Sequence, residues 1–147
     1  MLRFAAGPLV YDPGAATMAR PLLIILYVRD QERSRRFYAA VLGAAPTLDV
    51  PGMTEFDLPG GASLGLMPER GARALLGDAV PSPDSATGVP RCELYLRVAD
   101  PTAFVERAVA AGGRLIDGLR ARSWGEVVAY LVDADGHVVA FAQASEA

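Results

Sequence analysis

The chain has 147 residues, of which 52% are hydrophobic and 21% charged, enough for one domain with its own core. With Lys+Arg 14 against Asp+Glu 17, the net charge of -3 argues against a nucleic-acid-binding protein. A single histidine excludes a metal site with several histidine ligands, and a single cysteine excludes an internal disulfide, as expected in a reducing compartment.

Residues 1–20 are predicted to form an N-terminal extension without a fold of its own. Gly7-Pro8 and Asp12-Pro13-Gly14 interrupt the apolar run that a signal peptide would need. Alternatively, translation starts downstream, because Met18 directly precedes the first periodic segment. No later segment approaches the roughly 20 apolar residues of a membrane span, so we expect a cytoplasmic protein with no membrane partner.

Residues 21–67 are predicted to form a first unit. The run Leu22–Val28 is typical of a strand, Asp30 is a candidate helix N-cap, and Gly43 predicts where the helix ends. The apolar stripe of this helix consists of Phe37, Tyr38, Val41 and Leu42. A short second strand is expected at residues 48–50. Beyond Met53 the apolar period falls to two on both sides of Pro59-Gly60-Gly61, which predicts a β-hairpin.

Residues 68–90 are predicted to be a linker, since they are rich in Pro, Gly, Ser and Asp, with one helical turn expected at residues 73–76. Residues 91–143 then repeat the first unit. The pairs Val28 and Val98, Asp30 and Asp100, and Gly43 and Gly113 are each 70 positions apart. The second helix is expected to bury Phe104, Val105, Ala108 and Val109. A short strand at residues 114–116 and a hairpin around Asp133-Ala134-Asp135-Gly136 complete the unit.

Each unit is therefore predicted to be βαβββ, and the fold class to be α+β. The two tandem units are expected to form a curved eight-stranded sheet with the helices outside and a central hollow, because one small sheet covered by one helix leaves its other face wet. Such a hollow is the expected position of a ligand.

The segments LYVRDQERSRRFYAAVLG, ELYLRVAD and WGEVVAYLVDADGHVVAF resemble the vicinal-oxygen-chelate superfamily. This superfamily includes glyoxalase I, extradiol dioxygenases, and bleomycin- and fosfomycin-resistance proteins. The resemblance covers about residues 21–143. It implies the fold and a homodimer whose pockets include residues of both chains, but it does not select one chemistry.

The resemblance also implies metal ligands on the first and last strands of each unit, at Leu23, Gly65, Glu93 and Ala140. Only Glu93 offers a ligand atom, and one carboxylate cannot hold a divalent ion against water. We therefore expect no functional metal and no cofactor. The alternative is a displaced site built from Glu55, Glu93, Glu126 and His137.

Alternation along the strands assigns the faces of the sheet. If Leu23 and Glu93 face the hollow, then so do Ile25, Tyr27, Tyr95, Arg97, Val138 and Ala142. The residues expected to pack under the helices are Leu22, Ile24, Leu26, Leu94, Leu96, Val139 and Phe141.

The candidate ligand-binding residues are Tyr27, Glu93, Tyr95, Arg122, Trp124 and His137. Glu93 is a candidate general base or recognition group for a cationic ligand, with a salt bridge to Arg91 or Arg97 as the structural alternative. Trp124 either stacks on a planar ligand or closes one end of the sheet. Cys92 is expected to be a small buried hydrophobic residue.

The leading hypothesis is a metal-independent small-molecule-binding protein, similar to bleomycin-resistance-type members that sequester a ligand. One alternative is a glyoxalase-like lyase or isomerase, or a dioxygenase, with a displaced metal or Glu93 as the base. Another is a degenerate member whose sheet serves as an interaction surface.

Overall fold

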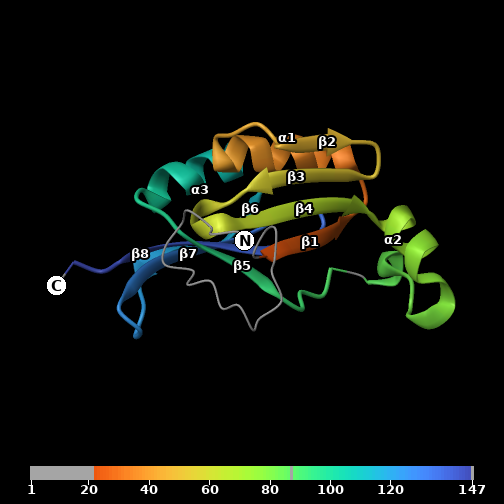
Figure 1. Ribbon diagram of the computed structural model, residues 1–147. Coiled ribbons are helices and arrows are strands. Elements are labelled where there is room, and N and C mark those ends of the chain that lie inside the picture. The colour runs from red at the N-terminus through yellow and green to blue at the C-terminus, as the bar shows by residue number, and fades with distance from the viewer. Residues whose placement is uncertain (1–21, 87, 147) are drawn as a thin grey trace, which may run out of the picture.

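The computed structural model describes residues 22–86 and 88–146, which form two consecutive βαβββ units (Figure 1). The first contains β1 (Leu22–Val28), α1 (Gln31–Leu42), β2 (Leu48–Val50), β3 (Met53–Asp57) and β4 (Ala62–Pro68). The second contains β5 (Glu93–Arg97), α3 (Pro101–Ala110), β6 (Arg114–Ala121), β7 (Glu126–Val132) and β8 (Val138–Ala144).

Each unit forms a four-stranded mixed sheet, in the order β1-β4-β3-β2 in the first and β5-β8-β7-β6 in the second. The pairs β1–β4 and β5–β8 are parallel, and the remaining pairs are antiparallel. The α+β fold of two tandem units is confirmed. Its eight strands form two separate sheets, which do not close into a barrel.

Both helices begin where their capping residues predict. The side chain of Asp30 accepts a hydrogen bond from the Arg33 amide, and Asp100 does the same for Ala103. Gly43 ends α1 in the left-handed conformation, with φ 64°. In the second unit the expected end at Gly113 is wrong by a few residues, because α3 stops at Ala110.

The main core lies between the helices and the sheets, and α1 and α3 pack side by side (Figure 1). Its buried residues are Leu26, Val28, Phe37, Tyr38, Val41, Phe56, Leu58, Leu64, Leu66, Leu94, Ala108, Leu131, Val139 and Phe141. The expected burial of Leu22, Ile24 and Val109 is wrong, since all three are exposed. Helix α1 packs mainly on β3 and β4, so the start of β1 lies beyond its cover.

The segment between the units is more ordered than its composition suggests. It contains α2 (Glu69–Leu76), which follows β4 directly and is longer than the single turn expected at residues 73–76. Strand β6 is also longer than expected, with register shifts against β7 on either side of Asp117. No helix in the described ranges is long and apolar enough to cross a membrane.

Candidate functional site

The second sheet carries a polar cluster on the face that points away from the helices. The cluster consists of Tyr95 and Arg97 on β5, Trp124 in the β6–β7 turn, and Glu126 at the start of β7. The Tyr95 hydroxyl and Arg97 Nε donate to the two carboxylate oxygens of Glu126, the latter at 2.7 Å. Trp124 Nε1 donates to the Tyr95 hydroxyl at 3.2 Å. Four side chains from three segments are thereby held in one arrangement.

The hydrogen bonds fix the charges of this cluster. Donation from Tyr95, and then from Arg97, lowers the pKa of Glu126, so its carboxylate is ionised at neutral pH. Partial burial and the bond to Glu126 raise the pKa of Tyr95, which keeps the phenol protonated. The arrangement suits the orientation of a ligand better than proton abstraction, because Glu126 already accepts from two strong donors.

Arg122 stabilises the strands on either side of the turn that carries Trp124. Its side chain is only 9% exposed, and its Nη1 lies 2.9 Å from Asp117 while its Nη2 donates to the Val128 carbonyl. The guanidinium also lies over the Tyr130 ring, 5.1 Å from its centre. Hydrogen bonds from Arg120 and then Arg122 lower the pKa of Asp117 to about 2. Arg122 therefore fixes the base of the turn that carries Trp124.

Glu93 lies at the start of β5, opposite Val138 and exposed to solvent. Among the described residues it makes no ion pair, so neither alternative salt bridge forms, and Arg97 pairs with Glu126 instead. Within residues 22–86 and 88–146, no apolar enclosure of the kind on which the general-base hypothesis depends surrounds the exposed Glu93.

The corresponding face of the first sheet is apolar. Leu23, Ile25 and Tyr27 project from β1 and remain between 36% and 39% exposed. Beside them, Gly65 on β4 is buried beneath carbon and sulfur atoms. A Cβ at Gly65 would lie 3.1 Å from Ile25 Cγ1 and 3.3 Å from both Leu23 Cδ1 and Met53 Sδ.

The donor set that the resemblance implies for a metal does not fit this chain. Leu23, Gly65 and Ala140 supply no side-chain ligand atom, and Ala140 is fully buried. The displaced site is also not assembled. Glu93 and Glu126 lie opposite Val138 and Ala144 of β8, six residues and thus about 20 Å apart along that strand.

The β7–β8 hairpin contains a cluster of three potential metal ligands that was not predicted from the sequence. It consists of Asp133, Asp135 and His137. Their ligand atoms lie within 4.8 Å of one another. The Asp133 carboxylate already accepts from Tyr38, from His137 Nδ1 and from two backbone amides. Asp135 accepts from the Arg29 amide and the Ser34 hydroxyl. These hydrogen bonds already occupy the two carboxylates and connect the second unit to the first.

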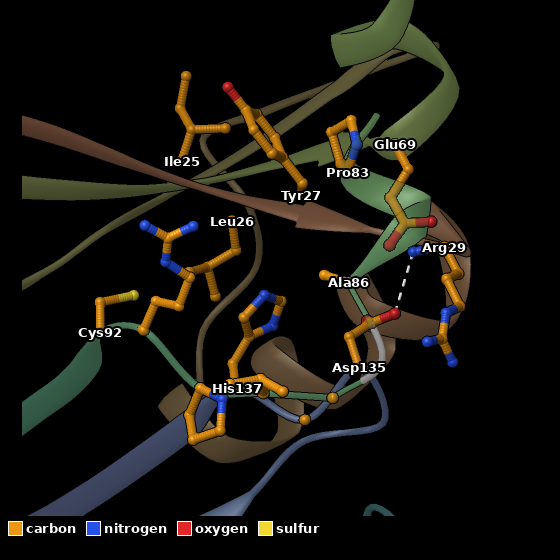
Figure 2. A pocket seen from close by; sticks show the side chains of 15 residues that line it. Ile25, Leu26, Tyr27, Arg29, Glu69, Pro83, Ala86, Cys92, Asp135 and His137 are labelled. Carbon is orange, nitrogen blue, oxygen red and sulfur yellow. Dashed lines mark hydrogen bonds between the residues drawn. The ribbon is translucent and has the colours of Figure 1, made fainter. Parts of the chain in front are cut away.

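A cavity of about 250 Å³ lies at the junction of the two units, and we call it the junction cavity (Figure 2). Its walls come from the end of β1, the start of α2, residues 83–86 and 88–92, and the β7–β8 hairpin. Tyr27 and His137 line it. Cys92 also lines it and is exposed, so its expected burial is wrong, because β5 begins one residue later and Cys92 lies outside the sheet.

The predicted site residues thus separate into two groups. Tyr95 and Trp124 are hydrogen-bonded in the polar cluster, and Arg122 is bonded to the strands next to it, whereas Tyr27 and His137 both line the junction cavity. Glu93 lies between the two groups along β5. Glu126 was expected only as a member of the displaced metal site and not beside Tyr95, and Glu69 was not predicted to bind a ligand. Glu126 could have been found from its place at the start of a strand that faces Tyr95, but only with the strand register known.

Comparison with known proteins agrees with this architecture. The pattern of the Glyoxalase/Bleomycin resistance protein/Dioxygenase superfamily matches residues 20–141. The chain belongs to this superfamily. Comparison with curated proteins gave no significant match.

Solved structures of the same architecture share modest sequence identity with the chain. A glyoxalase-related enzyme from Fulvimarina pelagi is 29% identical, with a TM-score of 0.71 over 86% of this chain and 88% of that one. A glyoxalase/bleomycin resistance protein/dioxygenase family enzyme from Burkholderia phytofirmans PsJN is 23% identical, with a TM-score of 0.71 over 83% and 96%. A protein of unknown function from Agrobacterium tumefaciens is 25% identical, with a TM-score of 0.64 over 92% and 98%. The superfamily hosts several chemistries, so the function has to be argued from this chain's own residues.

Proposed function

We propose that this superfamily member is a metal-independent small-molecule-binding protein whose ligand lies against the open faces of the two sheets. The observation that carries the proposal is the surroundings of Gly65. Where the superfamily resemblance implies a metal ligand, this chain has a glycine covered by Leu23, Ile25 and Met53. Carbon atoms at this position favour an apolar part of an organic ligand.

The polar cluster supplies the complementary part of such a site. Trp124 is 56% exposed, and its indole is tied at Nε1 to Tyr95. An aromatic surface fixed at its polar end offers contact area at low entropic cost. Arg97 and the Glu126 carboxylate lie beside it and can orient polar groups of the ligand.

We further propose that the protein is a homodimer in which the partner covers the open apolar face of β1. Leu23, Ile25 and Tyr27 form a contiguous exposed row, whereas monomeric proteins rarely leave such large apolar patches uncovered. A second copy would turn an open face into an enclosed site.

The deciding experiment measures the metal content of untagged protein and its thermal unfolding with zinc, nickel, manganese and iron(II). We expect substoichiometric metal and no saturable stabilisation. A small-molecule screen follows, with the emission of the chain's single tryptophan, Trp124, as the reporter. Glu93→Gln serves as the matched variant, because Glu93 alone of the four implied positions has a carboxylate.

A metal bound one to one and lost in Glu93→Gln would overturn the proposal in favour of glyoxalase-like or dioxygenase chemistry. Turnover of a bound compound, abolished in Glu93→Gln, would favour an enzyme that uses Glu93 as its base. Saturable quenching of Trp124 without turnover is the result we expect.

A further inference from the structure

The junction cavity differs in character from the open faces of the sheets. It has walls on several sides, contributed by β1, α2, the residues before β5 and the β7–β8 hairpin. Most of its lining is apolar, including Ile25, Leu26, Pro83 and Val89. At about 250 Å³ it lies below the range of roughly 300–1,000 Å³ typical of drug-sized ligands, so its occupant is small.

Two polar side chains point into this cavity, Glu69 from α2 and His137 from the hairpin (Figure 2). His137 uses Nδ1 to bond Asp133, which leaves Nε2 for the cavity. Glu69 has no hydrogen-bond or ion-pair partner within the part of the chain that the structure describes. The other carboxylate of the lining, Asp135, is occupied by the Arg29 amide and Ser34.

Glu69 is the carboxylate of the described lining that remains available to a cation. Burial lowers the pKa of His137, but the Asp133 hydrogen bond and the charges of Asp133, Asp135 and Glu69 outweigh it and raise the pKa. Because this favours the protonated imidazole, a bound cation should lie on the Glu69 side of the cavity, away from the His137 ring. The two arginines of the lining, Arg29 and Arg91, are both exposed, where water and salt screen their charge. The guanidinium of Arg29 also points away from the cavity (Figure 2).

The ring of Tyr27 adds a second feature that suits a cation. It lines the cavity beside the ring of Pro83, which lies between Tyr27 and Glu69 in this view (Figure 2). A carboxylate beside an aromatic ring and apolar walls is the combination that binds an ammonium group carrying a small apolar body. An anion would meet the unpaired Glu69 carboxylate instead.

We propose that the junction cavity binds a small amine, with its ammonium group between Glu69 and the Tyr27 ring and its apolar body against Ile25, Pro83 and Val89. This site shares Ile25 and Tyr27 with the open row of β1, whereas Glu69, Pro83 and Val89 line the cavity and are not part of that row. A variant at Glu69 therefore tests it separately from the function proposed above.

The chain's single cysteine gives a direct test, because Cys92 is an exposed member of the cavity wall. The rate of Cys92 alkylation by iodoacetamide is followed by mass spectrometry at pH 7.5 with increasing benzylamine, benzyl alcohol or phenylacetate. We expect benzylamine to slow alkylation saturably, at least three-fold, and the other two compounds to have little effect. This comparison of probes needs only the wild-type protein.

Glu69→Gln should abolish protection by benzylamine, measured as the ratio to that variant's own alkylation rate without a probe. Glu106→Gln, a change at an exposed glutamate of α3, is the matched control and should keep the protection. Equal protection by benzylamine and benzyl alcohol, stronger protection by phenylacetate, or no protection by any probe would each overturn the proposal. So would benzylamine protection that persists in Glu69→Gln.

Discussion

Tyr38 and Asp133 lie 95 residues apart in sequence, and the Tyr38 hydroxyl donates a 2.7 Å hydrogen bond to Asp133 Oδ2 inside the core. The bond joins α1 of the first unit to the β7–β8 hairpin of the second. His137 Nδ1 and the amides of Asp135 and His137 complete the set of donors to Asp133. A buried carboxylate is tolerated here because each oxygen accepts hydrogen bonds. The orientation of the two units therefore depends on a polar contact as well as on apolar packing.

Tyr38→Phe should destabilise the protein by about 1–3 kcal/mol, because it removes one donor from a buried charged acceptor. Urea unfolding followed by circular dichroism measures the effect. Tyr27→Phe is the matched control, since Tyr27 is exposed and its hydroxyl makes no hydrogen bond in the described ranges. Equal stability of Tyr38→Phe and the wild type would show that the bond contributes nothing.

The hydrogen bond between Asp133 and His137 should make the stability of the protein depend on pH. The pKa of His137 is raised above its ordinary value of 6.5, so its contribution is complete below pH 6.5 and is lost as pH rises through the folded-state pKa. Burial raises the pKa of Asp133, but the His137 hydrogen bond and charge outweigh it and lower the pKa below 3.8. The contribution of Asp133 is therefore present above pH 3.8 and is lost in stronger acid.

Between pH 6 and 9, the unfolding midpoint of the wild type in urea should fall further than that of His137→Gln, which has no titrating ring. The difference between the two proteins at each pH isolates the contribution of His137. Parallel pH profiles for the two proteins would contradict this assignment.

Gly113 brings the two units close together. A Cβ at this position would lie 2.8 Å from the Ala108 carbonyl oxygen and 3.1 Å from the Phe37 ring. Gly113→Ala should therefore cost about 1–3 kcal/mol through overpacking. Gly118 on β6 is the matched control, since an added Cβ there meets nothing within 4 Å. Thermal unfolding of both variants checks the prediction, and an equal loss in the two would show that the close approach to Ala108 and Phe37 is unimportant.

Local signals in the sequence were sufficient for the order of the elements within each βαβββ unit, but not for the length of α2 or β6. Asp30 and Asp100 identified the helix starts because a capping carboxylate acts within one turn. Burial was harder to predict, because alternation gives the two faces of a strand but not the extent of the helix that covers one of them. Leu22 and Ile24 lie on the face predicted to be covered, yet they are exposed at the start of an edge strand.

The candidate site was predictable only in part, for a related reason. Tyr95 and Trp124 were selected as single residues, but their bonds to each other and to Glu126 depend on how three segments meet. The free carboxylate of Glu69 could not be foreseen, since the sequence indicated only a linker there. Long-range contacts of this kind carry no local sequence pattern.

The proposed homodimer predicts a particle of twice the 15.5 kDa chain mass in size-exclusion chromatography with light scattering. Ile25→Lys places a charge in the exposed apolar row of β1 and should shift the protein to the monomer. Leu75→Lys is the control, because Leu75 is exposed on α2 and does not belong to the row on β1. A wild-type monomer, or a dimer that survives Ile25→Lys, would contradict the proposed interface.

The polar cluster predicts a spectroscopic effect that requires no ligand. Trp124 is 56% exposed, and its described hydrogen bond goes to the Tyr95 hydroxyl, so Tyr95→Phe should free the indole. Trp124 anisotropy should fall and its emission should move to longer wavelength. The unfolding midpoint should change little, because the Arg97–Glu126 ion pair is retained and the missing hydroxyl belongs to a partly exposed side chain.

Tyr130→Phe separates this effect from a general loosening of the sheet. Its ring packs against Arg122, while its hydroxyl makes no hydrogen bond among the residues described, so anisotropy and emission should match the wild type. Equal spectra for Tyr95→Phe and the wild type would show that the Tyr95 hydroxyl does not hold the indole. The aromatic surface would then depend for its orientation on packing and on the Glu126 carboxylate, with which Trp124 also interacts.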